Sequence, residues 1–216
     1  MMNKNILNFN LNEKSRFAFV FEQPFEELTL CSDVRVDLLN TKTYHLSNDC
    51  LQHNLAILIY FLKHGLDNKL QLHSSIRQDL GYLWNEKLAD SSEVELYYAT
   101  LEGRKYWVGK DYILFDTPDS FKESLTTWMY NDASGEIVIE ITPSYRWHFD
   151  DPDPNDSSYI TYDEFMKDYK PILLLKIPKH IAEAWLKQAQ DLLRIVQTNI
   201  ARTSAKMGIK IDNQNK

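Results

Sequence analysis

The stretch between Gly135 and Arg202 constrains the fold more than any other part of the chain. It contains two apolar segments, GEIVIEIT and PILLLKIP, followed by a long amphipathic segment, KHIAEAWLKQAQDLLRIVQTNIAR. In the last segment apolar residues recur every three or four positions for about five turns, which keeps them on one side of a helix. Two strands and a helix able to cover them predict a sheet packed against helices. We therefore expect an α+β fold, with a mainly antiparallel sheet and a long C-terminal amphipathic helix.

The rest of the chain adds elements of the same kind. Aromatic and β-branched residues predict an N-terminal strand pair at 16–22 and 34–38, and a three-stranded meander at 94–100, 105–108 and 113–115. A helix is expected to start after a cap at Ser47 or Asn48 and to end near Gly65, and a second is expected over 76–88. A third would open at Pro118, with a buried stripe formed by Phe121, Leu125, Trp128 and Met129.

Composition indicates one globular domain over residues 1–216. The chain has 216 residues, of which 44% are hydrophobic and 25% charged, enough for a single sizeable core. The polar segments 1–13 and 203–216 are expected to be frayed tails. Two cysteines, Cys31 and Cys50, are too few for a disulfide scaffold and are expected to be reduced thiols. No signal peptide is recognisable and the longest apolar run is far shorter than the roughly 20 residues of a membrane span, so we expect a cytoplasmic protein.

Acidic residues are concentrated in one part of the sequence. The formal charge is −7, and residues 111–168 hold 14 acidic and 3 basic side chains, a balance of −11, whereas the rest of the chain carries +4. Binding of nucleic acid or anionic lipid needs Lys and Arg to displace counterions, so neither is an expected partner. An acidic surface attracts a basic protein or a cation instead. We expect no cofactor, and the sequence leaves the oligomeric state undecided.

The segment DDPDPND resembles the start of a calcium-binding loop. Asp151, Asp153 and Asn155 match the first three ligand positions, but Asp156 stands where the loop needs Gly and Tyr162 where it needs Glu. The alternatives are a solvated surface loop and a docking surface for a basic partner. Large aromatic residues are common anchors of protein interfaces. The predicted partner-binding residues are Asp150, Asp151, Asp153, Asp156, Trp147 and Tyr159.

Two catalytic or metal-binding alternatives are open. Ser144, Arg146 and His148 would share one side of an extended segment and Asp150 follows, although neighbouring residues on one strand do not converge as a Ser-His-Asp relay must. The alternative function is therefore a small hydrolase or metal-dependent enzyme centred on His148, with Asp150 or Ser144. Elsewhere, Cys50, His53 and Asp49 make half a metal site, but a buried thiol and a capping Asp explain the same residues, and we favour this second interpretation.

Three segments carry a resemblance to a class of known proteins. EIVIEITPSYRWHF, YITYDEFMKDYKP and AWLKQAQDLL, within about residues 135–200, are similar to segments of small bacterial cytosolic proteins, some of which resemble immunity proteins of polymorphic and contact-dependent toxin systems. The resemblance implies a non-enzymatic protein that binds the toxin domain of a neighbouring cell and blocks it. A basic toxin would suit the acidic surface, because complementary charge raises association rate and specificity. A structural homo-oligomer is the third possibility.

Overall fold

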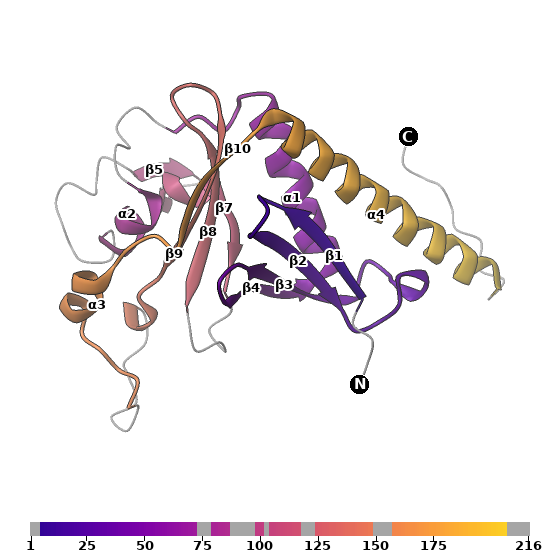
Figure 1. The fold of residues 1–216 in the computed structure, drawn as a ribbon, viewed down its shortest axis with the longest axis horizontal. Helices are drawn as coiled ribbons and strands as arrows, with labels where there is room; N and C mark the ends of the chain where they lie inside the picture. Colours follow the sequence, from indigo (N-terminus) through magenta and orange to yellow (C-terminus); the bar gives the residue numbers. More distant parts are fainter. Residues whose placement is uncertain are drawn as a thin grey trace. The chain divides into compact units, whose positions relative to one another are not determined.

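The structure is a computed structural model that describes residues 5–72, 79–86, 98–101, 104–117, 124–148 and 157–206 (Figure 1). Its packing gathers into two compact units. The first unit combines residues 1–63 with 180–216, and the second is the continuous stretch 64–179. Each unit contains a four-stranded antiparallel sheet, and a 28-residue helix ends the described chain. The predicted α+β class, the antiparallel sheets and the long C-terminal helix are confirmed, and the assignment of 1–216 to one domain stays a prediction.

The sheet of the first unit has the strand order β1-β2-β3-β4. Its strands are β1 (Asn5–Asn10), β2 (Arg16–Phe21), β3 (Asp33–Leu39) and β4 (Thr43–Cys50), with a short 3₁₀ helix η1 (Phe25–Glu27) after β2. Apolar side chains that stand opposite one another across the strands, such as Phe9, Phe17 and Leu38, share one face of this sheet. The helices α1 (Leu51–Leu66) and α4 (Lys179–Lys206) follow β4 and β10 in the chain.

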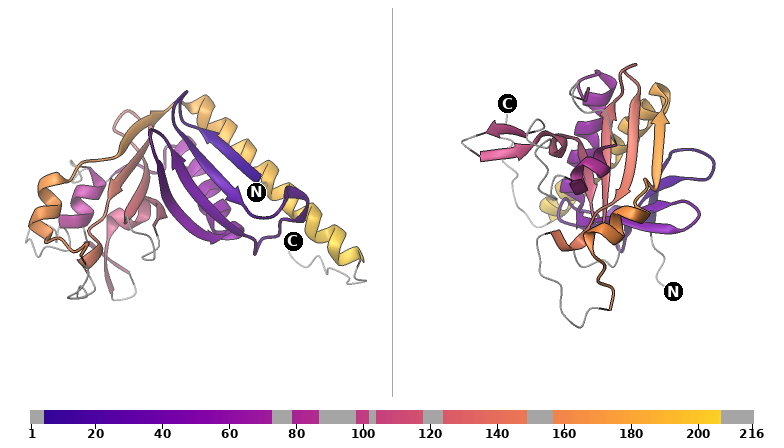
Figure 2. Two further views of the ribbon diagram at one scale, coloured as in Figure 1. Left: turned by 60° about the horizontal axis from the view of Figure 1, so that its bottom comes forward. Right: turned by 90° about the vertical axis from the view of Figure 1, so that its left-hand side faces the viewer.

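Both helices cover the same face of the first sheet. Phe9 and Phe17 contact the Trp185 ring of α4, with ring centroids 5.8 and 5.7 Å apart. On β4, Ser47 donates to Asn54 Oδ1 of α1 at 2.8 Å, and Ser47 stands opposite Val36 on this face. In the left view of Figure 2 the indigo and purple strands lie in front of the gold helix α4. The core of the first unit is therefore a two-layer sandwich of sheet and helices.

Helix α4 also covers the edge strand β1. The Trp185 indole N–H donates to the backbone carbonyl of Asn10 at 3.0 Å, and the Gln188 amide donates to that of Asn8 at 2.9 Å. Further along, Asn199 donates to the carbonyls of Phe25 and Leu28. Carbonyls of an edge strand otherwise invite pairing with another chain, so these side chains close that edge.

The sheet of the second unit has the order β10-β9-β8-β7. Its strands are β7 (Ile113–Asp116), β8 (Leu125–Asn131), β9 (Ile137–Pro143) and β10 (Leu173–Ile177), and β5 (Tyr98–Leu101) pairs with β6 (Arg104–Trp107) as a separate ribbon. The remaining elements are α2 (Leu80–Glu86), α3 (Tyr162–Asp168) and the 3₁₀ helices η3 (Val108–Tyr112) and η4 (Arg146–His148). Helix α2 packs on β8 and β9, where Leu80 and Leu83 form a core cluster with Trp128, Tyr130 and Val138.

The predicted helix after Pro118 is wrong over its second half, which is strand β8. All seven residues of β8 are buried, so apolar side chains face both sides and the i, i+3, i+4 spacing of Leu125, Trp128 and Met129 carries no helical meaning. Residues 118–123, including Phe121, lie outside the described residues. The predicted meander is also corrected, because β7 pairs with β8 and not with β6.

Helix and strand ends differ from the sequence predictions in the first unit. Ser47 and Asn48 belong to β4 and do not cap α1, which begins at Leu51. Helix α1 runs through Gly65 to Leu66, and the left-handed residue after it is Asn68, with φ 57°. Residues 5–10, expected in a frayed tail, form β1, because Phe9 is fully buried in the sheet core. At the other end α4 extends to Lys206, beyond the predicted start of the tail.

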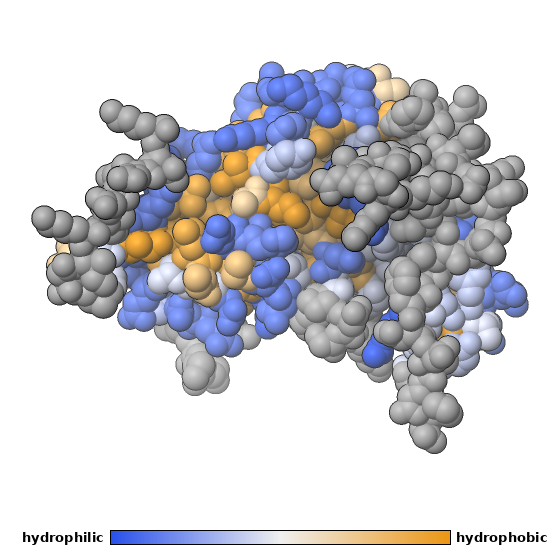
Figure 3. Space-filling model, turned by 180° about the vertical axis from the view of Figure 1, so that it is seen from behind, coloured by the Kyte–Doolittle hydropathy of each residue, from blue (hydrophilic) through white to orange (hydrophobic). Residues whose placement is uncertain are grey.

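Some apolar surface stays outside these cores. Tyr60 on α1 is 49% exposed, and Ile195 on α4 is 43% exposed. Seen from behind, apolar side chains gather in an area bordered by hydrophilic ones (Figure 3). Within the described part of the chain, none of the helices combines the length and the hydropathy needed to cross a membrane. Cys31 and Cys50 are both free in the structure.

Candidate functional site

Six aromatic residues of the second unit form a continuous cluster, which we call the aromatic surface. Tyr145 lies at its centre, and its ring contacts those of Trp147, Tyr162 and Phe165 with centroids 5.7, 5.6 and 5.4 Å apart. The cluster extends from Trp147 to Tyr159 at 5.4 Å and from Phe165 to Tyr169 at 6.1 Å. The six residues are Tyr145, Trp147, Tyr159, Tyr162, Phe165 and Tyr169.

The local sequence explains how this cluster forms. Strand β9 ends at Pro143, and the turn of η4 brings Trp147 back beside Tyr145. Helix α3 begins with a capping box, in which Thr161 and Glu164 bond each other's backbone N–H groups. No residue of α3 is buried, so its aromatic side chains stay partly accessible while they contact Tyr145. The Tyr145 hydroxyl donates to the Ile160 carbonyl at 3.0 Å, which fixes the approach to α3.

Trp147 and Tyr159, two predicted anchors, are brought together by this arrangement. Their ring centroids lie 5.4 Å apart, and Tyr159 and its neighbour Ile160 are 43% and 40% exposed. The guanidinium of Arg146 lies 5.8 Å from the Trp147 ring, a cation–π contact. The other four predicted residues, Asp150, Asp151, Asp153 and Asp156, lie outside the described residues. Because the chain between Trp147 and Tyr159 carries these aspartates, this acidic segment starts and ends at the aromatic surface.

Exposed carboxylates flank the aromatic surface on α3. Asp163 and Glu164 occupy the first turn of the helix, where the helix dipole favours negative charge. The Thr161 backbone N–H, followed by its side chain, lowers the pKa of Glu164. This glutamate therefore stays ionised at neutral pH. Burial raises the pKa of Tyr162, and nearby Glu86 raises it further. Negative charge therefore lies beside the rings at the start of α3.

Beneath the aromatic surface lies a buried polar network that joins α2 to β9. The Gly81 N–H donates to Glu140 Oε1 at 2.9 Å, and the Tyr130 hydroxyl donates to Glu140 Oε2 at 3.1 Å. Tyr169, at the end of α3, donates to the Asp79 carboxylate, which also accepts the Tyr82 N–H at 2.7 Å. Burial, aided by the charge of Asp79, raises the pKa of Glu140 to about 7.

Asn85 connects α2 to the centre of the aromatic surface. Its side chain is fully buried and accepts the Tyr145 backbone N–H at 2.7 Å. The same side chain donates to the carbonyls of Gly81 at 2.8 Å and Pro143 at 3.0 Å. Neither Asn85 nor Glu140 was predicted from the sequence as a site residue. The available signal was a carboxylate inside the otherwise apolar strand IVIEIT, which predicts a buried acid on one face.

The residues of the catalytic alternative are not brought into a catalytic arrangement among the described residues. Thr126 donates its only hydroxyl proton to Asp116 at 3.0 Å, so Ser144, 2.7 Å from Thr126, is the donor in that pair. Ser144 is buried, and its hydroxyl proton is already donated to Thr126 Oγ1. The side chain of His148, like Asp150, lies outside the described residues.

The described residues do not complete the half metal site. Asp49 and Cys50 end β4, and His53 follows on α1 as an exposed partner of Asp49 at 3.8 Å. Among described residues, no group of three His, Cys, Asp or Glu side chains converges as metal ligands do. A different acid of the first unit, Asp37, is only 2% exposed and is bound by Arg35 at 3.0 Å and His45 at 2.7 Å. It lies across the sheet from the helices, on the face of Ala18, and sequence analysis did not single it out.

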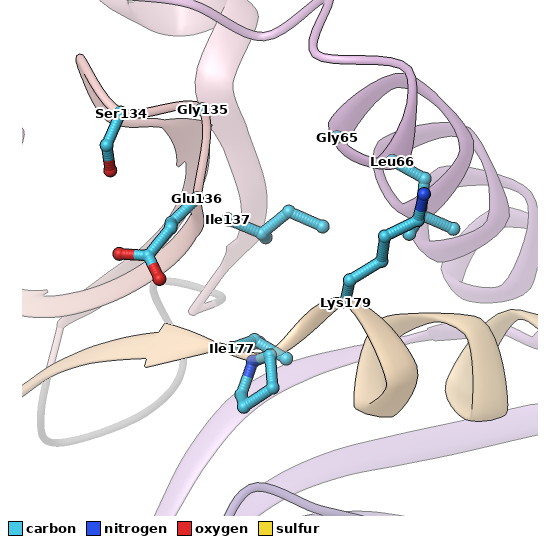
Figure 4. Close-up of a pocket in the computed structure, with 9 residues that line it drawn as sticks. Gly65, Leu66, Ser134, Gly135, Glu136, Ile137, Ile177 and Lys179 are labelled. Carbon is cyan, nitrogen blue, oxygen red and sulfur yellow. The ribbon is translucent and has the colours of Figure 1, made fainter.

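A small pocket lies elsewhere in the second unit. It has a volume of about 200 Å³ between Gly65–Leu66, the turn at Ser134–Ile137 and the segment Ile177–Lys179 (Figure 4). The carboxylate of Glu136 points away from Lys179 in this view and pairs with Lys176 at 2.7 Å. None of these lining residues belongs to the aromatic surface.

Comparison with known proteins adds no relative. The chain matches no protein family model, no curated protein and no solved structure.

Proposed function

We propose that this protein is a non-enzymatic binding protein of the immunity type, which neutralises a basic protein toxin in the cytoplasm. The observation that carries the proposal is the contact between Trp147 and Tyr159, 5.4 Å apart, at the two ends of the acidic segment. The two apolar anchors thus lie together at the ends of that segment, and helix α3 adds the carboxylates of Asp163 and Glu164. A basic partner with an apolar patch fits such a surface.

The chemistry of the surface favours a partner rich in arginine. Trp and Tyr rings attract guanidinium groups through cation–π contacts and are frequent hot spots of interfaces. Exposed Tyr159 and Ile160 supply apolar contact area, while Asp163 and Glu164 supply charge at its border. Charge complementarity raises the association rate, and the buried aromatic contacts slow dissociation.

The ring contacts also prepare the surface for binding. Tyr145 is held by its hydroxyl bond to Ile160, by its backbone bond to Asn85 and by three neighbouring rings. Side chains that are already ordered lose less conformational entropy when a partner binds. This smaller loss of entropy strengthens the binding of a one-to-one inhibitor to its target.

The test is capture of the partner by the tagged protein from its native lysate, with stepwise salt elution and mass spectrometry. We expect one basic protein in stoichiometric amount, and co-expression should suppress that protein's toxicity. The double variant W147A/Y159A removes both anchors and should lower recovery at least tenfold, about 1.4 kcal/mol of binding free energy.

The matched control is Tyr60→Ala, which removes an exposed aromatic ring from α1 in the first unit. Its capture should equal that of the wild type. If W147A/Y159A binds the partner as well as this control does, the aromatic surface is not the binding site.

The acidic segment is tested separately. Replacing Asp150, Asp151, Asp153 and Asp156 by Asn should slow association with the basic partner and flatten its dependence on salt. Stopped-flow or biolayer association rates at two or more ionic strengths measure both effects. An unchanged salt dependence would remove these aspartates from the binding site.

A further inference from the structure

Glu140 is a buried carboxylate without a cationic partner among the described residues. It projects from β9 toward α2 and is 0% exposed. Its oxygens accept hydrogen bonds from the Gly81 N–H and the Tyr130 hydroxyl, at 2.9 and 3.1 Å. A buried ionised carboxylate needs paired charge or several donors to offset its lost hydration. These two neutral donors, together with a contribution from the Leu80 backbone N–H, offset only part of that cost.

The ionisable groups that face Glu140 make its charged form less favourable still. Burial is the largest cause of the raised pKa of Glu140. Asp79, just before α2, is a second carboxylate, and its negative charge raises the pKa of Glu140 further. Tyr130 of β8 donates to Glu140, and the pKa of Tyr130 is raised by burial and by that carboxylate. Tyr169, after α3, donates to Asp79, and its pKa is raised by burial and by Asp79. Both tyrosines therefore stay neutral in the pH range in which Glu140 titrates.

Helix α2 transmits any change at Glu140 to the aromatic surface. Its first turn is bonded to Glu140 through Gly81, and its last turn holds the Tyr145 backbone through Asn85 at 2.7 Å. In the middle, the Tyr82 ring contacts that of Tyr169 with centroids 5.9 Å apart. A shift of α2 on β9 would thus displace two members of the aromatic surface.

We propose that Glu140 is a proton-controlled latch that sets how firmly α2, and with it the aromatic surface, is held on the sheet. When Glu140 takes up a proton from solvent, its neutral carboxyl group no longer repels Asp79, and α2 is held tightly. When the proton is released to solvent, the negative charge on Glu140 again repels that of Asp79, and α2 loosens. The importance of the latch for partner binding rests on the proposed function, whereas the latch itself does not.

The test uses the full-length protein without a partner, between pH 5.5 and 8.5. Amide exchange of residues 80–86, corrected for the intrinsic effect of pH, measures docking of α2, and near-UV circular dichroism follows the aromatic surface. With Glu140 titrating near pH 7 when docked and near 4.5 when released, docking should weaken on the order of 30-fold across this range. Glu140→Gln keeps the size of the side chain without its charge and should abolish both transitions.

Two further variants distinguish the latch from a general effect of pH. Glu183→Gln removes an exposed carboxylate from α4 and should leave both transitions unchanged. Tyr130→Phe removes a donor that favours the ionised carboxylate, so the midpoint should move to higher pH. Transitions that persist in Glu140→Gln, or a wild type without transitions, would overturn the latch.

A binding measurement then separates the latch from the proposed function. Affinity for the captured partner should fall from pH 6 to pH 8 in the wild type more steeply than in Glu140→Gln. If the partner binds W147A/Y159A normally while the transitions occur as expected, the proposed function fails and the latch stands.

Discussion

The α-carbon of Gly81, in helix α2, lies against the side chain of Thr142 on strand β9. A Cβ atom added to Gly81 would lie 2.0 Å from Thr142 Oγ1 and 2.3 Å from Thr142 Cβ, far inside van der Waals contact. The absence of a side chain is what allows the Gly81 N–H to reach Glu140. Gly81 weakens a helix by propensity, and its close approach to β9 is the compensating reason for its presence.

Gly81→Ala should therefore destabilise the protein by about 1 to 3 kcal/mol, the usual range for overpacking. Gly65→Ala on α1 is the matched control, because its Cβ would meet only side-chain atoms of Ile137, at 3.1 and 3.2 Å, and of Leu70, at 3.7 Å. A helical Ala gains about 1 kcal/mol over Gly, so Gly65→Ala should be nearly neutral. Urea unfolding of both variants measures the difference, and equal stabilities would contradict the close packing of α2 on β9.

Two neighbouring threonines of β8 make a second residue-scale prediction. Thr127 Oγ1 is buried and has no hydrogen-bond partner among the described residues, so Thr127→Val should stabilise the protein by about 1 kcal/mol. Thr126, equally buried, bonds Asp116 and Ser144. Thr126→Val should destabilise by about 1 to 3 kcal/mol, because both partners lose a bond. Thermal unfolding of the two variants checks whether Thr127→Val raises the melting temperature and Thr126→Val lowers it.

Among the elements, α3 depends on its cap more than on burial. It is seven residues long, none of them buried, and it begins with the reciprocal bonds of Thr161 and Glu164. A helix this short is marginal without tertiary support or capping. Its remaining support comes from ring contacts to Tyr145.

Thr161→Ala should cost about 1 kcal/mol and increase amide exchange within residues 162–168 before it affects the sheets. Thr198→Ala is the control, because Thr198 lies inside α4 and its hydroxyl bonds only the Arg194 carbonyl of the same helix. Exchange that rises equally in α3 and in the sheets would show that α3 does not open independently.

Elements with one apolar face could be predicted from the sequence, and elements buried on both faces could not. In α4 the buried residues Trp185, Ala189, Leu192 and Val196 follow the predicted stripe, since the opposite side meets solvent. Strand β8 is buried throughout, and its spacing fitted a helix as well as a strand. β-branched Thr126 and Thr127 were the better signal, because such residues favour strands.

The candidate site shows the same limit. Trp147 and Tyr159 could be proposed from the sequence, because both flank an acidic segment. Their partners Tyr145, Phe165 and Tyr169 join them through three-dimensional contacts between η4, α3 and the chain after it. Sequence spacing does not encode such contacts. Asn85 was hidden for a related reason, because its burial depends on what α2 packs against, whereas the place of Glu140 inside an apolar strand was a signal that the sequence offered.

For the whole molecule, Glu140 predicts how stability changes with pH. Its pKa is raised from its ordinary value of 4.5 to about 7, so its contribution to stability is fully present below 4.5 and is lost as pH rises through 7. The free energy of unfolding should fall by about 2 to 3 kcal/mol between pH 5 and pH 8. Urea unfolding of the wild type and of Glu140→Gln at several pH values measures this fall. The histidines are the same in both proteins, so their contribution cancels in the difference between the two free energies of unfolding. An equal slope in both proteins would contradict the assignment.

The division of the first unit between the two ends of the sequence has a consequence for synthesis on the ribosome. Strands β1–β4 are translated roughly ten seconds or more before Trp185 and Gln188, at ordinary rates of elongation. During that time Phe9 and Phe17 lack the ring that covers them, and the Asn8 and Asn10 carbonyls lack their donors. The second unit, a continuous stretch, is complete before α4 emerges. The nascent chain therefore finishes its second unit first and closes its first unit last.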